Sequence, residues 1–159
     1  MFKLSLIALT LLGAAATGHA SSSAQQVVNQ ISQFGVTYQV KDNQAALHGT
    51  DCAALGADYA ACNRATITLT NNGPALTDKH WAIYMSNVHQ TLRVDNEQFK
   101  MTHLVGDLTR LEPTERFTGI GAGESVQITI VNEYWQLFAT DVMPRWYVRS
   151  GQATPKIIA

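Results

Sequence analysis

The stretch ATITLTNNGP, residues 65–74, has the pattern of a half-buried antiparallel strand. Ile67 and Leu69 alternate with threonines, so the two apolar side chains point to one face and the threonines to the other. The run from Asn71 to Pro74 then supplies residues that end a strand and begin a turn. The stretch therefore predicts a strand that packs one face on a core and leaves the other face polar.

Similar patterns recur along the rest of the chain and are separated by turn signals about every ten residues. We expect further strands at 36–40, 81–86, 91–94, 99–105, 108–111, 125–131 and 146–149. In the segment 24–34, apolar residues recur at helical spacing from Val27 to Phe34, which predicts one short N-terminal helix. Because strands do not alternate with helices, the chain is predicted to be all-β, an antiparallel β-sandwich rather than a parallel α/β fold.

The first twenty residues, MFKLSLIALTLLGAAATGHA, have the features of a secretory signal peptide. Lys3 precedes an apolar run from Leu4 to Ala16, and small residues close the segment at Ala20. That run of about a dozen residues is too short to span a hydrocarbon core about 30 Å thick. We expect cleavage after residue 20, export to the periplasm or the medium, and one mature domain over 21–159 with no membrane attachment.

The two cysteines, Cys52 and Cys62, lie in the stretch DCAALGADYAAC. Because a signal peptide directs the chain to an oxidising compartment, a disulfide between them is the expected state. A metal pair or a redox-active dithiol is the alternative, but neither has its usual C-x-x-C spacing here.

Composition and motifs offer little support for catalysis. Charged residues make up 14% of the chain, and removing Lys3 leaves 10 cations against 12 anions, so nothing here attracts nucleic acid. No metal-ligand pattern, nucleophile elbow, phosphate loop or dinucleotide fingerprint is present, and no metal or cofactor is predicted. Glu112 and Glu115 are the nearest pair of carboxylates, but Pro113 between them indicates a solvated turn rather than a glycosidase site.

Aromatic residues remain as the resource for binding. The stretch NEYWQLFATDVMPRWYV, residues 132–148, holds four candidates for a sugar-binding ring: Tyr134, Trp135, Trp146 and Tyr147. Flat rings with a polar tip lose little conformational entropy on binding and stack on the apolar faces of sugars. Since adjacent residues in a strand point to opposite faces, we expect each pair to place one ring in the core and one at the surface.

Three stretches resemble a known family: DCAALGADYAACNR at 51–64, the run from QTLRV to GAGESV at 90–126, and EYWQLFATDVMPRWYV at 133–148. They are similar to the N-terminal domain of bacterial chitobiases, the β-N-acetylhexosaminidases of glycoside hydrolase family 20. The resemblance implies a sandwich similar to cellulose-binding modules, a disulfide at the cysteine pair, and a role in holding chitin oligomers or other polysaccharide. In that family a catalytic (β/α)8 barrel follows, and this sequence contains none.

Two functions are therefore expected. The first is an exported, non-catalytic module that binds chitin or N-acetylglucosamine oligomers. The alternative is a structural or interaction domain, a fragment of a β-N-acetylhexosaminidase, that packs on a glycoside hydrolase barrel. The alternative predicts a contiguous exposed apolar patch around residues 134–147, larger than a monomer surface usually carries.

Overall fold

The computed structural model describes residues 16–138, 141–143 and 145–158. Most of the predicted signal peptide, residues 1–15, lies outside the described residues. The helix α1 (Ala16–Ile31) runs across the expected cleavage point, starting earlier and ending three residues sooner than the sequence pattern predicts. Within the described residues, no helix is both long and apolar enough to span a membrane.

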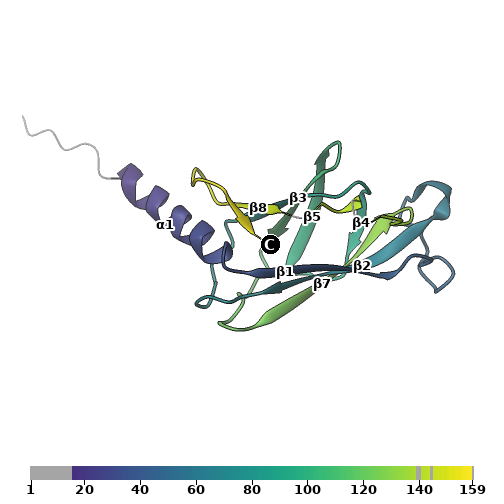
Figure 1. Ribbon diagram of the computed structural model, residues 1–159, viewed down its shortest axis with the longest axis horizontal. Coiled ribbons are helices and arrows are strands. Elements are labelled where there is room, and N and C mark those ends of the chain that lie inside the picture. The colour runs from purple at the N-terminus through teal and green to yellow at the C-terminus, as the bar shows by residue number, and fades with distance from the viewer. Residues whose placement is uncertain (1–15, 139–140, 144, 159) are drawn as a thin grey trace, which may run out of the picture.

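Two antiparallel sheets face each other, which confirms the predicted sandwich (Figure 1). The four-stranded sheet has the order β1 (Gly35–Asp42), β2 (Cys62–Thr70), β7 (Ser125–Glu133) and β4 (Thr91–Val94). The five-stranded sheet has the order β5 (Phe99–Val105), β6 (Leu108–Pro113), β3 (Ala82–Ser86), β8 (Trp146–Arg149) and β9 (Lys156–Ile158). The strand β9 was not predicted, because three residues are too few to show alternation.

The stretch that predicts the fold lies at the centre of the four-stranded sheet. Ile67 and Leu69 of β2 are fully buried, as expected, while Thr68 and Thr70 are only half-buried on the opposite face. Both neighbouring strands pair with β2 along most of its length. Burial removes the apolar side chains of Ile67 and Leu69 from water, so the alternation determines which face of β2 points into the core.

The core lies between the sheets and extends to the helix at one end. Apolar side chains of β2 and β7 pack with Ile83 and Met85 of β3 and with Leu111 of β6. From α1, Val28 and Ile31 are fully buried in the same core, so the helix closes one end of the sandwich (Figure 1).

The opposite end carries the loop closed by the disulfide. Cys52 and Cys62 are bonded with their Cα atoms 5.6 Å apart, which confirms the predicted disulfide. Both cysteines are buried in a small second core with Val131 of β7. A short 3-10 helix, η1 (Asp58–Ala60), lies inside the loop. The cross-link thus fixes a surface loop to the start of β2.

Candidate functional site

The four predicted rings lie in different surroundings. Trp146 is only 4% exposed, and its indole N–H donates to the carbonyl of Met143 at 2.9 Å inside the core. An enclosed ring cannot stack on a ligand, so the prediction that Trp146 binds sugar is wrong. Tyr147, the next residue along β8, is 48% exposed on the outer face of the five-stranded sheet, beside Tyr84 of β3. The expected alternation of one buried and one exposed ring therefore holds for this pair.

Tyr134 and Trp135 follow the end of β7, near the disulfide loop. Trp135 is 47% exposed, while Tyr134 is half-buried and has a left-handed backbone with φ of 58°. Such a conformation costs about 1–3 kcal/mol in a non-glycine residue and needs support from its surroundings. The N–H of Tyr134 donates to the carbonyl of Ala61 at 2.9 Å, and the amide of Asn63 donates to the carbonyl of Tyr134 at 3.1 Å. These bonds fix the direction in which the chain leaves the sheet.

A buried amide network lies beneath this segment and centres on Asn132. Its amide nitrogen donates to the hydroxyl of Tyr38 at 3.0 Å and to the amide oxygen of Asn63 at 3.3 Å. Its oxygen accepts from Thr91 at 2.8 Å and from Asn87 at 3.4 Å. The two donors and the two acceptor positions of the side chain are all used. A buried polar group without a hydrogen-bond partner lowers the stability of the fold, so this network specifies one arrangement of the strand ends.

The network continues to the segment itself through Tyr38 and Gln136. The Tyr38 hydroxyl donates to the side-chain oxygen of Gln136 at 2.9 Å, and Asn43 bonds both the N–H and the carbonyl of Gln136 at 2.9 and 2.7 Å. Burial raises the pKa of the Tyr38 phenol, so it remains a neutral donor. Sequence reasoning missed these positions, because scattered asparagines show no period from which a shared site could be found.

A groove forms between Trp135 and Tyr59, and we call it the Tyr59–Trp135 groove. It has a volume of about 250 Å³, and Leu47, Gln44 and Cys62 also line it. Tyr59 belongs to η1 in the disulfide loop and is 90% exposed. Tyr59 was not predicted from the sequence as a candidate binding residue. Its position between two cysteines was a usable signal, because a short closed loop tends to lie at the surface. The cross-link at Cys62 therefore supports one wall of the groove.

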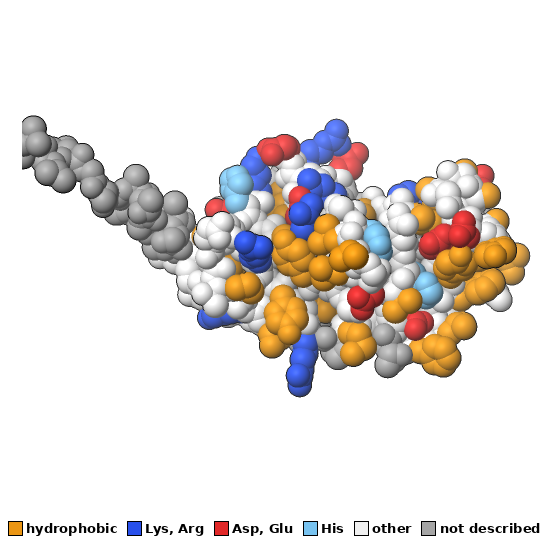
Figure 2. All heavy atoms as spheres, turned by 90° about the horizontal axis from the view of Figure 1, so that it is seen from above, with side chains coloured by type: hydrophobic (Ala, Val, Ile, Leu, Met, Phe, Trp, Pro, Cys, Tyr) orange, Lys and Arg blue, Asp and Glu red, His pale blue; other side chains and the backbone are white. Residues whose placement is uncertain are grey.

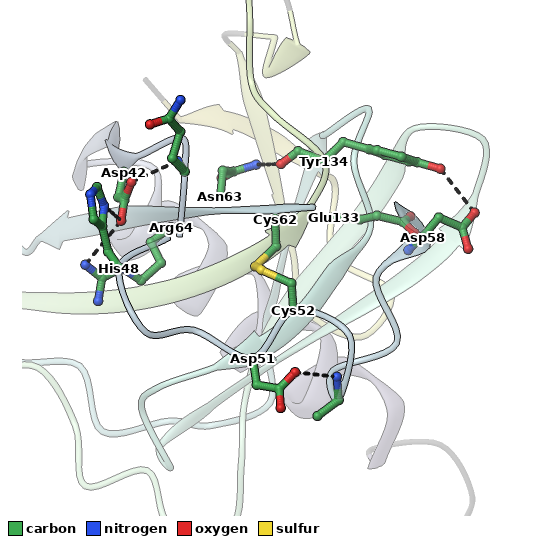
Figure 3. The surroundings of a disulfide bond; sticks show 12 residues. Asp42, His48, Asp51, Cys52, Asp58, Cys62, Asn63, Arg64, Glu133 and Tyr134 are labelled. Carbon is green, nitrogen blue, oxygen red and sulfur yellow. Dashed lines mark hydrogen bonds and ion pairs between the residues drawn. A yellow bond between two sulfur atoms is a disulfide. The ribbon is translucent and has the colours of Figure 1, made fainter. Parts of the chain in front are cut away.

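Tyr134 stands behind this groove rather than inside it. Its ring centroid lies 6.3 Å from that of Tyr59 and 6.0 Å from that of His89. Its hydroxyl donates to a carboxylate oxygen of Asp58 at 3.1 Å, and Figure 3 shows the phenol directed at this residue. Desolvation, and then the hydrogen bond to Asp58, raise the pKa of Tyr134. The phenol therefore braces the loop as a neutral donor.

An apolar patch lies farther along the same segment and consists of Leu137, Phe138 and Met143. All three are exposed, and the first two line a hollow of about 350 Å³ beside Val142. The interaction-domain hypothesis predicts a contiguous patch around residues 134–147 that is larger than a monomer usually carries, and these three side chains are the exposed apolar residues that the structure places there beside Trp135 and Tyr147.

The carboxylates considered for catalysis are engaged in ion pairs. Glu112 pairs with Lys100 at 2.9 Å and with Arg110, while Glu115 pairs with Lys79. The Lys79 ammonium lowers the pKa of Glu115, whereas a general acid needs a raised one. Among the described residues, no group of three His, Cys, Asp or Glu side chains is placed to hold a metal ion. The arrangement of this pair does not support glycoside hydrolysis.

Comparison with known proteins places this fold in a family. The model of a family described as "Putative carbohydrate binding domain" matches residues 33–159. The chain is 45% identical over 161 residues to N,N'-diacetylchitobiase of Vibrio harveyi, covering 100% of this chain and 18% of that protein. It is 34% identical over 131 residues to a β-hexosaminidase of Vibrio vulnificus, covering 78% of this chain and 15% of that protein.

Solved structures agree with the fold. Crystal structures of a GH20 exo-β-N-acetylglucosaminidase from Vibrio harveyi match with a TM-score of 0.52 at 14% identity, over 79% of this chain and 17% of that one. The chain thus spans less than a fifth of the length of these relatives, and its 159 residues contain no catalytic barrel. On the family match and the sandwich fold together, the chain belongs to the carbohydrate-binding domain family of chitobiases and β-hexosaminidases.

Proposed function

We propose that the domain binds N-acetylglucosamine oligomers, such as those of chitin, at the Tyr59–Trp135 groove. The observation that carries this proposal is the meeting of two exposed rings, from the disulfide loop and from the end of β7, in one groove of about 250 Å³. The name of the 45% identical relative, N,N'-diacetylchitobiase, supports the choice of sugar.

The lining of the groove suits an acetylated amino sugar. The faces of the rings of Tyr59 and Trp135 can cover the apolar C–H face of a sugar, which removes apolar surface of both partners from water. Leu47 offers an apolar contact for the acetamido methyl group, and Gln44 offers both a donor and an acceptor for hydroxyl groups. No covalent chemistry is needed for such binding.

The groove is held in shape before a ligand arrives. The disulfide fixes the loop that carries Tyr59, and the hydrogen bonds of Asn63 and Asn43 fix the segment that carries Trp135. Ordering of side chains and loops normally opposes binding by about 0.5–1.5 kcal/mol per side chain. Folding has already supplied much of that ordering here.

Isothermal titration calorimetry with N-acetylglucosamine hexamer tests the proposal. Trp135→Ala and Tyr59→Ala should each weaken binding about tenfold, which corresponds to about 1.4 kcal/mol. Tyr147→Ala is the matched control, because it removes a ring that is as exposed as that of Trp135 but lies on another face. Absence of binding by the unchanged domain, or equal loss in the Tyr147 variant, would contradict this assignment.

Export is the second part of the proposal. A disulfide that closes a structural loop is typical of oxidising compartments, and residues 1–20 have the features of a signal peptide. Expression with residues 1–20 intact, followed by cell fractionation and N-terminal sequencing, should find a mature chain that begins at Ser21 outside the cytoplasm. Retention of the uncleaved chain in the cytoplasm would refute this part.

The apolar patch supports a second candidate function, docking on the remainder of a longer β-hexosaminidase. The patch is exposed, and the chain spans only 18% of the chitobiase it matches. Sedimentation of the domain with a separately expressed β-hexosaminidase barrel should give a complex that Leu137→Gln with Phe138→Gln abolishes. A domain that stays alone at all concentrations counts against docking.

A further inference from the structure

A second hollow lies on the outer face of the five-stranded sheet, away from the Tyr59–Trp135 groove. Its volume is about 430 Å³, and we call it the sheet-face hollow. Its charged lining consists of Lys79, Lys100, Arg110, Arg149, Glu112 and Glu115. Figure 2 looks onto this side of the molecule and shows lysine and arginine side chains distributed over it, with aspartate and glutamate side chains beside several of them.

The register of the strands explains why the sheet is hollowed here. Ile83 of β3 is buried, so its neighbours Ala82 and Tyr84 face outward. Ala82 is paired with Arg149 of β8, and Tyr84 is paired with Tyr147. A methyl group thus lies among long side chains, with Tyr84 in the lining of the hollow and Tyr147 opposite Tyr84 in the strand register.

The charges that line the hollow do not cancel. Glu112 is shared by Lys100 and Arg110, and Glu115 pairs with Lys79, so four cations face two carboxylates. Arg149 donates from Nε to the carbonyl of Gly151 at 3.1 Å, and no carboxylate in the described part of the chain pairs with it. The lining is therefore locally positive, in a chain whose formal net charge is -1.

We propose that the sheet-face hollow binds an anionic saccharide, a sugar unit that carries a carboxylate or a sulfate group. The exposed guanidinium of Arg149 can donate two parallel hydrogen bonds to two oxygens of a carboxylate or of a sulfate at once. Tyr84 lines the same hollow, and Tyr147 shares the exposed face of β8 with Arg149, so these rings are available to contact the C–H face of the same sugar. Three of the four cations are held by their carboxylates, which leaves Arg149 as the residue that determines binding.

Affinity electrophoresis in gels that contain a soluble polymer tests this site. Polygalacturonate supplies carboxylates, chondroitin sulfate supplies carboxylates with sulfates, and dextran is the neutral control. The unchanged domain should be retarded by at least one anionic polymer and not by dextran, and 0.5 M salt should reduce the retardation because it screens exposed charge. Retardation by polygalacturonate shows that a carboxylate is sufficient for binding, and retardation by chondroitin sulfate alone shows that the sulfate is required. No retardation by either anionic polymer at low salt would overturn the proposal.

Charge-matched variants separate a site from diffuse attraction. Arg149→Gln should weaken binding about tenfold or more, as expected for the loss of a hydrogen bond to a charged group. Lys41→Gln removes the same charge from an exposed residue of β1 on the other sheet and should change affinity less than about twofold. Equal losses in both variants would show diffuse electrostatics and overturn the site.

The proposal stands apart from the chitin-oligomer proposal. Trp135→Ala should leave binding of the anionic polymer unchanged, and Arg149→Gln should leave hexamer binding unchanged. Loss of anionic binding in the Trp135 variant would refute a separate site on the sheet. Failure of hexamer binding alone would refute only the function proposed for the Tyr59–Trp135 groove.

Discussion

Reduction of the Cys52–Cys62 disulfide should destabilise the domain by about 2.5–3 kcal/mol. The cysteines are ten residues apart, and the chain-entropy relation for a loop of that size gives this value at 25 °C. Both sulfur atoms are buried in a small apolar cluster, where free thiols can remain as small hydrophobic groups. Reduction therefore acts mainly on the unfolded ensemble. For a domain of this size the melting temperature should fall by about 6–12 °C.

Urea unfolding followed by tryptophan fluorescence, with and without a phosphine reductant, measures this loss. The Cys52→Ala, Cys62→Ala double variant should lose slightly more, since it also removes two buried sulfur atoms. Because Tyr59 lies inside the closed loop, the reduced domain should also bind N-acetylglucosamine hexamer more weakly. Equal midpoints and equal affinities in the two redox states would refute the reasoning that the cross-link holds both loop and groove.

Three further changes test other parts of the structure by urea unfolding. Trp146→Ala should destabilise the domain by about 3–5 kcal/mol because it leaves a cavity in the core, whereas Trp135→Ala should cost less than about 1 kcal/mol. Similar losses in the two variants would contradict the assignment of Trp146 as buried and Trp135 as exposed. Asn132→Leu should cost about 2–4 kcal/mol by leaving its partners unsatisfied, and a neutral result would show that the network is dispensable. The hydrogen bond from the N–H of Gln44, and then the one from the His48 side chain, lower the pKa of Asp42 in the folded protein. The ionised carboxylate therefore stabilises the fold at pH values above the ordinary Asp pKa near 3.9. This contribution is lost as the pH falls through the lowered pKa. Asp42→Asn should therefore flatten the pH dependence of stability below about pH 4, and an unchanged profile would contradict this role.

The strands could be predicted because burial of one sheet face imposes a period of two on the sequence. Ile67 and Leu69 show this alternation, and the structure places both in the core. The short strand β9 escaped prediction, since three residues give no measurable period and only pairing with β8 orders them. The disulfide followed from the number of cysteines and the expected compartment.

The candidate sites were only partly predictable. The pattern of adjacent rings correctly indicated that Trp146 and Tyr147 divide between core and surface, but not which of the two is buried. Arg149 carried no local signal for binding, and the place of Tyr59 between two cysteines indicated a surface position but not a ligand. Their importance depends on which distant residues lie beside them.

The sequence by itself determined the sandwich, the cross-linked loop and the family, because alternation, the number of cysteines and extended similarity are properties of the linear chain. The tertiary structure alone decided where binding surfaces form. It brings Tyr59 next to Trp135 by closing a loop against the end of β7, and it places Arg149 beside Ala82 by the register of two strands. Both surfaces depend on packing between segments far apart in sequence, and no local pattern records such contacts.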